Sequence, residues 1–448
     1  MKTVVKEVSL FFLLVGLISC FVLDNIGFKV PIAFGQTKPS SSSIPKAPKE
    51  LKVALVDFLS GPPAKAGTAA INAGRLFIEQ INEAGGIGGV KIKPIIVDEA
   101  GGVEKQVTEF RRLVLDEKVD AVLGYLSSAD CLAIAPVADE LKTLTIFNGS
   151  GTSKLFEQRD YKYAFRAVNY EGSENVAAAL YVTSMKPDLK TIVGINQDYA
   201  WGRDSWETFE RAMRRLKPGA KVLETLWPKL GAVEFSAEIS KSLAAKPDVL
   251  HTSLWAGFLD SFIKQAAPRG VFKETQVVAT VGERSIVTIG KDMPEGIIVG
   301  GRGGFVPYIL PDPKANAEAK KFYELYEARF GEMPIADSFN MVQDILAMKA
   351  AYEKAIKTYS RWPTTEEVAK ALEFLQFDSL GVRVSMALGK GHQAIHPQVF
   401  GITGSQRHPK WGFPLLEKVK IYPAEKVNPP STVKHLDWID SWPEGKGP

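Results

Sequence analysis

The sequence predicts an α/β fold built from two doubly wound, mainly parallel sheets. Short β-branched apolar segments alternate along the chain with segments whose apolar residues recur at helical spacing, and this alternation starts again after residue 170. A length of 448 residues leaves room for two or three domains. We therefore expect two lobes, each with a sheet covered by helices on both faces.

The folded part of the chain is expected to begin at residue 51. A short apolar strand at Lys52–Asp57 is followed by apolar residues at helical spacing over residues 66–84. The glycines of Gly85–Gly89 end this helix and lead into a second strand at 90–97. The next predicted elements are helix 103–117, strand 121–124, helix 131–141 and strand 144–147.

The second half repeats the helix–strand pattern four times. Its predicted pairs are 171–185 with 191–195, 202–216 with 221–225, 234–245 with 249–252, and 257–267 with 276–279. Helices at 313–330, 338–357 and 364–375 follow, with final strands near 381–387 and 397–403. The chain after about Lys418 is expected to be irregular.

The N-terminal segment predicts export. Lys2 and Lys6 precede the apolar run Val8–Leu23, which is the arrangement of a signal sequence. This run is shorter than a typical membrane span, and no later segment approaches about 18 uninterrupted apolar residues. We expect residues 1–35 to be a signal peptide, the mature form to have no membrane span, and the protein to be located in the periplasm.

Two processing routes fit this segment. Leu17–Cys20 matches a bacterial lipobox, in which Cys20 would carry a lipid anchor, whereas Ala33–Gly35 has the small-residue spacing of ordinary cleavage. The residues after Cys20 are apolar, which favours plain cleavage because the tether of a lipoprotein is usually polar. Residues 36–50, rich in Pro, Ser and Lys, are expected to form a linker.

Composition and spacing argue against several classes of function. The net charge of +4 comes from 55 basic and 51 acidic residues spread along the chain, which does not indicate nucleic-acid binding. Two cysteines, Cys20 and Cys131, cannot form a disulfide framework or a cysteine zinc site. His392 and His396 lie four apart, but a neighbouring glycine and proline oppose the helix that would align them on a metal.

The standard catalytic and cofactor motifs are also missing. The sequence has no complete dinucleotide fingerprint, phosphate-binding loop, nucleophile elbow or zincin motif. We therefore expect no catalytic residue, no metal and no nucleotide cofactor. An exported α/β enzyme remains an alternative that no motif supports.

Small polar residues follow two predicted strands of the first half. Ser127 and Ser128 come after the strand ending at Gly124, and the segment Asn148–Thr152 comes after the strand ending at Phe147. Ligands of open α/β sheets bind outside the carboxyl ends of the strands, where hydroxyl and backbone N–H groups suit a carboxylate. The same residue types are common helix caps, so the pattern leaves both roles open.

Short motifs also recur in a fixed order along nearly the whole mature chain. They include Lys52–Val56, Ser60–Pro62, Gly85–Ile87, Asp120–Gly124 with Ser127 and Ser128, Phe165-Arg166, Asp198–Gly202, Phe262–Ala266, Glu295-Gly296 and Gly391–Gln393. In order and spacing, across roughly residues 51–405, the chain resembles the type I periplasmic binding proteins of the leucine/isoleucine/valine-binding class. A disulfide of some relatives is impossible here, because Gly101 and Ser127 occupy that region.

The resemblance implies two Rossmann-like lobes that are joined by three crossover segments and close on a ligand about a hinge. With the restart after residue 170, it places lobe 1 at 51–167 plus 303–378, lobe 2 at 168–302 plus 379–420, and a tail at 421–448. It implies capture of a small organic solute in the interlobe cleft and delivery to ABC permease subunits in the inner membrane. A sensory ligand-binding module of the same fold is an alternative.

The resemblance also assigns roles in the first lobe. Ser128 matches the serine that receives the α-carboxylate of the ligand. Ser150, Gly151 and Thr152 lie where backbone and hydroxyl groups share that task, with an alignment uncertain by one residue. These four residues are the expected polar side of the cleft.

In the second lobe, Trp201 matches an aromatic position that covers the ligand, and Trp255 falls near another. Glu283 is the nearest candidate for the acid that pairs an α-ammonium group, although Gly282 fits that position equally well. Because no acid is clearly matched, a branched-chain amino acid, an amide and an aromatic or other carboxylic acid all remain open as solutes.

Overall fold

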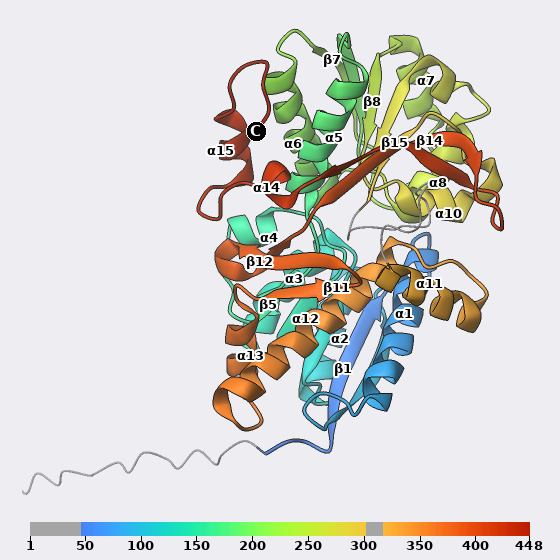
Figure 1. The fold of residues 1–448 in the computed structure, drawn as a ribbon. Helices are drawn as coiled ribbons and strands as arrows, with labels where there is room; N and C mark the ends of the chain where they lie inside the picture. The colour runs from blue at the N-terminus through green and yellow to red at the C-terminus, as the bar shows by residue number, and fades with distance from the viewer. Residues whose placement is uncertain (1–45, 302–316) are drawn as a thin grey trace, which may run out of the picture. The chain divides into compact units, whose positions relative to one another are not determined.

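The computed structural model describes residues 46–301 and 317–448, which contain two main sheets and one small sheet (Figure 1). The predicted signal peptide, the lipidation site at Cys20, most of the linker and the predicted helix start at 313–316 lie outside the described residues. Those predictions therefore stay untested.

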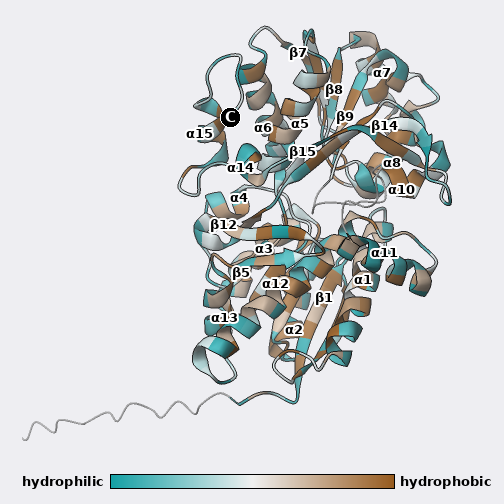
Figure 2. Ribbon diagram, in the orientation of Figure 1, coloured by the Kyte–Doolittle hydropathy of each residue, from teal (hydrophilic) through white to brown (hydrophobic). Residues whose placement is uncertain are grey.

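The first sheet has five parallel strands in the order β2-β1-β3-β4-β5. Strand β1, which pairs with β2 and β3, is almost completely buried and is coloured mainly as hydrophobic in Figure 2. The strands are β1 (Glu50–Asp57), β2 (Lys91–Asp98), β3 (Ala121–Gly124), β4 (Leu144–Phe147) and β5 (Ala164–Phe165). The helices that connect them are α1 (Ala64–Glu83), α2 (Val103–Leu115), α3 (Ser128–Glu140) and α4 (Lys154–Glu157).

Helix α1 illustrates how the sequence positions a layer on this sheet. Its small residues Ala70, Ala73 and Gly74 are buried on one face. A Cβ atom at Gly74 would lie 2.9 Å from a side-chain carbon of Leu55 in β1 and 2.9 Å from one of Met341 in α12 (Ala336–Tyr359). Glycine therefore allows α1 to pack closely against the strand and the helix at once.

The second sheet has seven strands in the order β15-β14-β10-β9-β8-β6-β7. Its strands are β6 (Thr191–Ile195), β7 (Lys221–Leu226), β8 (Val249–Thr252), β9 (Gln276–Ala279), β10 (Ile298–Gly300), β14 (Gln398–Arg407) and β15 (Pro414–Tyr422). The helices are α5 (Glu171–Met185), α6 (Ala200–Leu216), α7 (Ser236–Ala245), α8 (Ala256–Ala266), α9 (Val271–Glu274) and α10 (Glu283–Ile289). Pairing is parallel from β10 to β7, and β14 runs antiparallel to both of its neighbours.

The predicted α/β architecture with two mainly parallel sheets is confirmed. Most predicted strands of the first half and of the repeat after residue 170 match within one or two residues, because short β-branched runs are distinctive. The predicted helix 131–141 begins earlier, at Ser128. The two-residue strand β5 was missed, because so short a segment carries no periodicity.

A small antiparallel sheet packs beside the first sheet. It consists of β11 (Gln376–Ser379), β12 (Val382–Leu388) and β13 (Gln393–Ile395), and it follows α11 (Ala317–Phe330), α12 and α13 (Thr365–Leu372). Val384, Met386 and Ala394 lie in the same buried apolar cluster as Leu55 of β1. The predicted boundary at 378/379 therefore falls too early, since residues 379–395 belong with the first lobe.

Two of the segments that connect the lobes lie side by side. Residues 166–170 lead from β5 to α5, and residues 396–397 lead from β13 to β14. The backbone of Arg166 accepts from Ala394 N at 2.9 Å and donates to His392 O at 2.8 Å. Residues 301–316, most of them outside the described ranges, separate β10 from α11.

The C-terminal chain is ordered, which contradicts the expectation of an irregular tail after Lys418. Strand β15 continues to Tyr422, and two short helices follow, α14 (Ala424–Val427) and α15 (His435–Asp440). Ile439 and Trp442 are buried in the apolar cluster of α5 and α6. The sequence did not predict this packing, because the segment is too short and too rich in prolines to show a clear periodicity.

Candidate functional site

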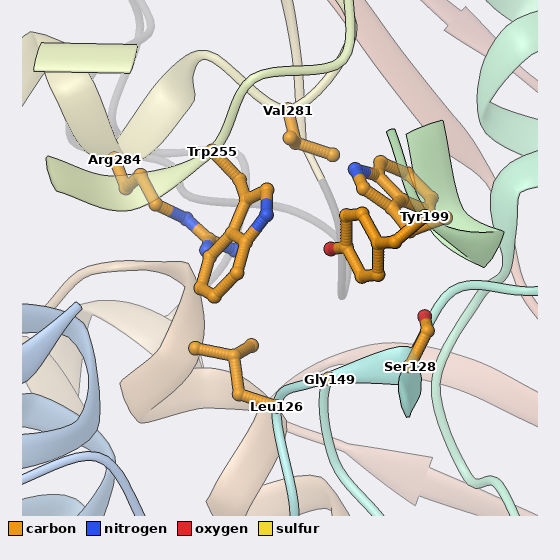
Figure 3. Close-up of a pocket in the computed structure, with 8 residues that line it drawn as sticks. Leu126, Ser128, Gly149, Tyr199, Trp255, Val281 and Arg284 are labelled. Atoms are coloured by element: carbon orange, nitrogen blue, oxygen red, sulfur yellow. The ribbon is translucent and has the colours of Figure 1, made fainter. Parts of the chain in front are cut away.

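A pocket lies between the carboxyl ends of strands from the two main sheets (Figure 3). Its empty space, about 240 Å³, includes space that is open to solvent. From the first sheet, Leu126 and Ser128 follow β3 and Gly149 follows β4. From the second sheet, Tyr199 and Trp201 follow β6, Trp255 follows β8, and Val281 and Arg284 follow β9.

Ser128 is the first residue of α3 and lies on the pocket wall. Its Oγ accepts hydrogen bonds from Gly151 N at 3.1 Å and from Thr152 N at 3.4 Å. Ser128 does not cap α3, whose N-cap residue is Ser127; its hydroxyl instead fixes the neighbouring loop. Those two backbone N–H groups point at the serine, so Gly151 and Thr152 do not line the pocket as predicted.

Thr152 and Ser150 do not line the pocket but form hydrogen bonds with residues around it. The Thr152 hydroxyl donates to Asp204 Oδ2 of α6 at 2.5 Å, and Asp204 also pairs with Lys154 Nζ at 2.6 Å. The carbonyl of Ser150 accepts from Arg166 Nη1 at 2.8 Å, and its buried hydroxyl has no hydrogen-bond partner among the described residues. Both residues therefore lie behind the wall, where Thr152 links the two lobes.

Replacing Ser128 by alanine should destabilise the protein by about 1–3 kcal/mol, because two buried N–H groups lose their acceptor. Equilibrium unfolding in urea measures the change, and Ser405→Ala on the exposed part of β14 is the matched control. An unchanged midpoint for Ser128→Ala would mean that other acceptors replace the hydroxyl.

Glu99 positions the loop that carries Leu126 and Ser128. Its carboxylate, at the end of β2, accepts from Leu126 N and from Ser127 N, both at 2.8 Å. The group is fully buried, and desolvation together with Asp57 and Asp130 raises its pKa well above the usual value. This carboxylate joins the same two loops in which the sequence had excluded a disulfide.

Trp201 and Trp255, which the resemblance assigned to the ligand, both line the pocket. Trp201 Nε1 donates to the carbonyl of Ser253 at 2.8 Å, so its indole is held by the backbone. Trp255 packs edge-on against Phe258 at 5.2 Å between ring centroids. Tyr199 was missed, although it belongs to the same motif as Trp201, and Figure 3 shows its hydroxyl directed towards the middle of the pocket.

Arg284, rather than Glu283, faces the pocket. Both side chains are buried, and Glu283 Oε1 lies 4.0 Å from Arg284 Nε. Arg284 Nη2 lies 3.3 Å from Asp337 Oδ1 at the start of α12, which makes an ion pair between the two lobes. Burial raises the pKa of Glu283 to about 7, and the charge of Arg284 opposes that shift.

The lobes also touch beside the pocket. A Cβ atom at Gly257 of α8 would lie 2.2 Å from the carbonyl oxygen of Pro62 in the loop after β1. Phe58 of the same loop lies 6.3 Å from Trp255 between ring centroids. The absence of a side chain at Gly257 therefore permits this close approach.

Comparisons with known proteins agree with this architecture. A family model described as periplasmic binding protein matches residues 50–402. The leucine-specific-binding protein of Salmonella typhimurium is 26% identical over 253 residues, covering 56% of this chain and 66% of that protein. The leucine-, isoleucine-, valine-, threonine- and alanine-binding protein of Pseudomonas aeruginosa is 24% identical over 257 residues, covering 57% and 68%. The chain thus aligns with no more than about two thirds of either relative's length.

Solved structures show the same fold. A solute-binding protein of an ABC transporter from Rhodopseudomonas palustris, in complex with 3,4-dihydroxybenzoic acid, has a TM-score of 0.74 at 20% identity and covers 86% of this chain and 100% of that one. A branched-chain amino acid transporter substrate-binding protein from Streptococcus pneumoniae, in complex with isoleucine, has a TM-score of 0.69 at 18% identity and covers 84% and 100%. At 18–20% sequence identity, these two matches show a similar fold and nothing more specific.

Proposed function

Since the chain belongs to the periplasmic binding protein family, we propose that it captures a small organic solute between its two lobes and delivers it to the permease subunits of an ABC transporter. Family membership confirms the resemblance drawn from the order of motifs. The family implies an extracytoplasmic location. Processing at Cys20 or after Gly35 remains a prediction.

The observation that carries this proposal is the composition of the pocket wall. Residues after β3 and β4 face residues after β6, β8 and β9, so the two lobes contribute opposite sides. A solute held there would contact both lobes at once and would favour the arrangement in which they meet. Two indoles offer broad apolar faces, and the polar side chains are few, as in small-molecule sites.

Binding without chemistry is the function we propose for this site. The family is one of solute-binding proteins. The described lining residues include a serine and a tyrosine but no histidine or carboxylate that could act as a general base. Within the described ranges, no helix is long and apolar enough to cross a membrane, and no three His, Cys, Asp or Glu side chains are grouped to hold a metal ion.

A thermal-shift screen of amino acids, amides and carboxylic acids tests the proposal. A solute at 100 times its dissociation constant should add about 2.7 kcal/mol to the free energy of unfolding. Gly257→Val, which forces a side chain against Pro62, should weaken binding of that solute because it holds the lobes apart. Small-angle scattering should show that the solute compacts the wild-type protein and not this variant. Turnover of a bound compound, or binding without compaction, would contradict the proposal.

A further inference from the structure

Arg284 is a buried cation whose Nε has no hydrogen-bond partner among the residues that the structure describes. Its side chain is 2% exposed and lines the pocket. It has two ion contacts, from Nη2 to Asp337 Oδ1 at 3.3 Å and from Nε to Glu283 Oε1 at 4.0 Å, but its Nε has no hydrogen-bond partner among the described residues. Because a guanidinium has five N–H donors, burying it in this state is costly unless another acceptor completes it.

Trp255 presents a second unused donor to the same pocket. The residue is 5% exposed, and its Nε1 has no hydrogen-bond partner among the described residues. Trp201 differs, since its Nε1 donates to Ser253 O. Figure 3 draws Trp255 and Arg284 on the second-lobe side of the pocket and Leu126 on the opposite side. Two donors that line one pocket suit a group with two acceptor oxygens.

The pocket offers little to a cationic group. The two carboxylates in ion contact with Arg284, those of Glu283 and Asp337, are not among the described residues of the pocket wall. The described lining residues therefore include one cation and no anion. An ammonium group in the pocket would face Arg284 without a carboxylate to pair with it.

We infer that the solute is a small carboxylic acid with an apolar body and no ammonium group, and that Arg284 and Trp255 bind its carboxylate. The inference rests on the proposed function and narrows the class of its solute. Leu126, Val281 and the faces of Trp201 and Trp255 surround the apolar body. This arrangement differs from the expected one, in which Ser128 and the 150–152 loop bind the carboxylate, because the N–H groups of Gly151 and Thr152 already donate to Ser128 Oγ. Of that expected set, the Ser128 O–H is the donor that these bonds leave available.

Matched pairs of probes separate charge from shape. Benzoate and benzamide differ in the anionic charge, and 4-methylpentanoate and leucine differ in the ammonium group. We expect each acid to bind at least about 10-fold more tightly than its partner, in line with the strength of hydrogen bonds to charged groups. Titration calorimetry with the wild-type protein measures all four probes. The quenching of tryptophan fluorescence provides a second readout.

Two variants test the named donors. Arg284→Gln should weaken binding of the acids by about 10- to 100-fold, and Trp255→Phe, which keeps a ring and removes the N–H, by about 5- to 10-fold. Arg75→Gln on the exposed side of α1 is the matched control and should leave affinity unchanged. If Arg284→Gln does not fold, the affinities of Trp255→Phe for the acids and of the wild-type protein for the two matched pairs of probes still test the inference.

The outcomes distinguish this inference from the proposed function. Equal or tighter binding of leucine or benzamide overturns the inference and leaves a solute-binding protein in place. Acid binding that survives Arg284→Gln unchanged also overturns it. If neither acid binds while the wider thermal-shift screen yields a neutral or cationic solute that closes the lobes, the inference is wrong and the proposed function stands.

Discussion

Replacing Arg166 by methionine should lower the free energy of unfolding by about 3–5 kcal/mol, because it leaves buried acceptors without a charged donor. Arg166 is 1% exposed. Its Nη1 donates to Ser150 O at 2.8 Å and to Thr152 O at 2.9 Å, and its Nε donates to Gln393 Oε1 at 2.5 Å. One side chain, at the start of the connecting segment 166–170, thus joins the loop beside the pocket to β13.

Urea unfolding of Arg166→Met, compared with Arg75→Met on an exposed face, measures this effect. The conservative Arg166→Lys should recover only part of the loss, because an ammonium group cannot reproduce the planar set of three hydrogen bonds. Solute affinity should also fall, since Arg166 fixes the carbonyls of the loop that Ser128 holds from the other side. A loss below about 1 kcal/mol would mean that water replaces the guanidinium.

Arg166 also shows how far the sequence alone could lead. Phe165-Arg166 and Gly391–Gln393 stood out as separate motifs more than 200 residues apart. In the structure they touch, because Arg166 bonds to Gln393 and the ring of Phe165 stacks on His392 at 4.1 Å. Periodicity predicts which segments become strands and helices, but it contains no information about such contacts across the chain.

The candidate site shows the same division between what periodicity predicts and what it cannot. The strand-end rule indicated Ser128, the family resemblance indicated Ser128, Trp201 and Trp255, and these three residues line one pocket. The resemblance left Glu283 and Gly282 open; the pocket wall contains neither of them but does contain Arg284. Neighbouring residues at a helix start point in different directions, so a shift of one position exchanges an acid for a base on the wall.

The buried acids around Arg284 are the source of the second large effect. Burial raises the pKa of Glu283 to about 7, and Asp337 adds to the shift while Arg284 opposes it. Burial likewise raises the pKa of Asp57, at the end of β1, to about 7. Neither oxygen of Glu283 has a hydrogen-bond partner among the described residues, so ionising it inside the protein gains little compensation.

The direction of the pH effect follows from these values. An unfolded glutamate releases its proton near pH 4.5, whereas folded Glu283 holds it up to about pH 7. Between those values the folded protein binds more protons than the unfolded chain, so its stability falls as the pH rises and becomes level above about pH 7. Glutamine at this position keeps the shape of the neutral acid and never ionises. It therefore removes the cost only where the wild-type carboxyl is charged.

Glu283→Gln should accordingly have little effect on the free energy of unfolding at pH 4.5 and should raise it by about 2–3 kcal/mol at pH 8. Urea titrations of the solute-free protein at both pH values measure the difference between variant and wild type. Asp57 contributes equally to both proteins and cancels in that comparison. Glu83→Gln, at the exposed end of α1, is the control and should show no pH-dependent gain. Destabilisation by Glu283→Gln of the same size at both pH values would instead show that the carboxylate stabilises Arg284, and that its ionisation carries no net cost.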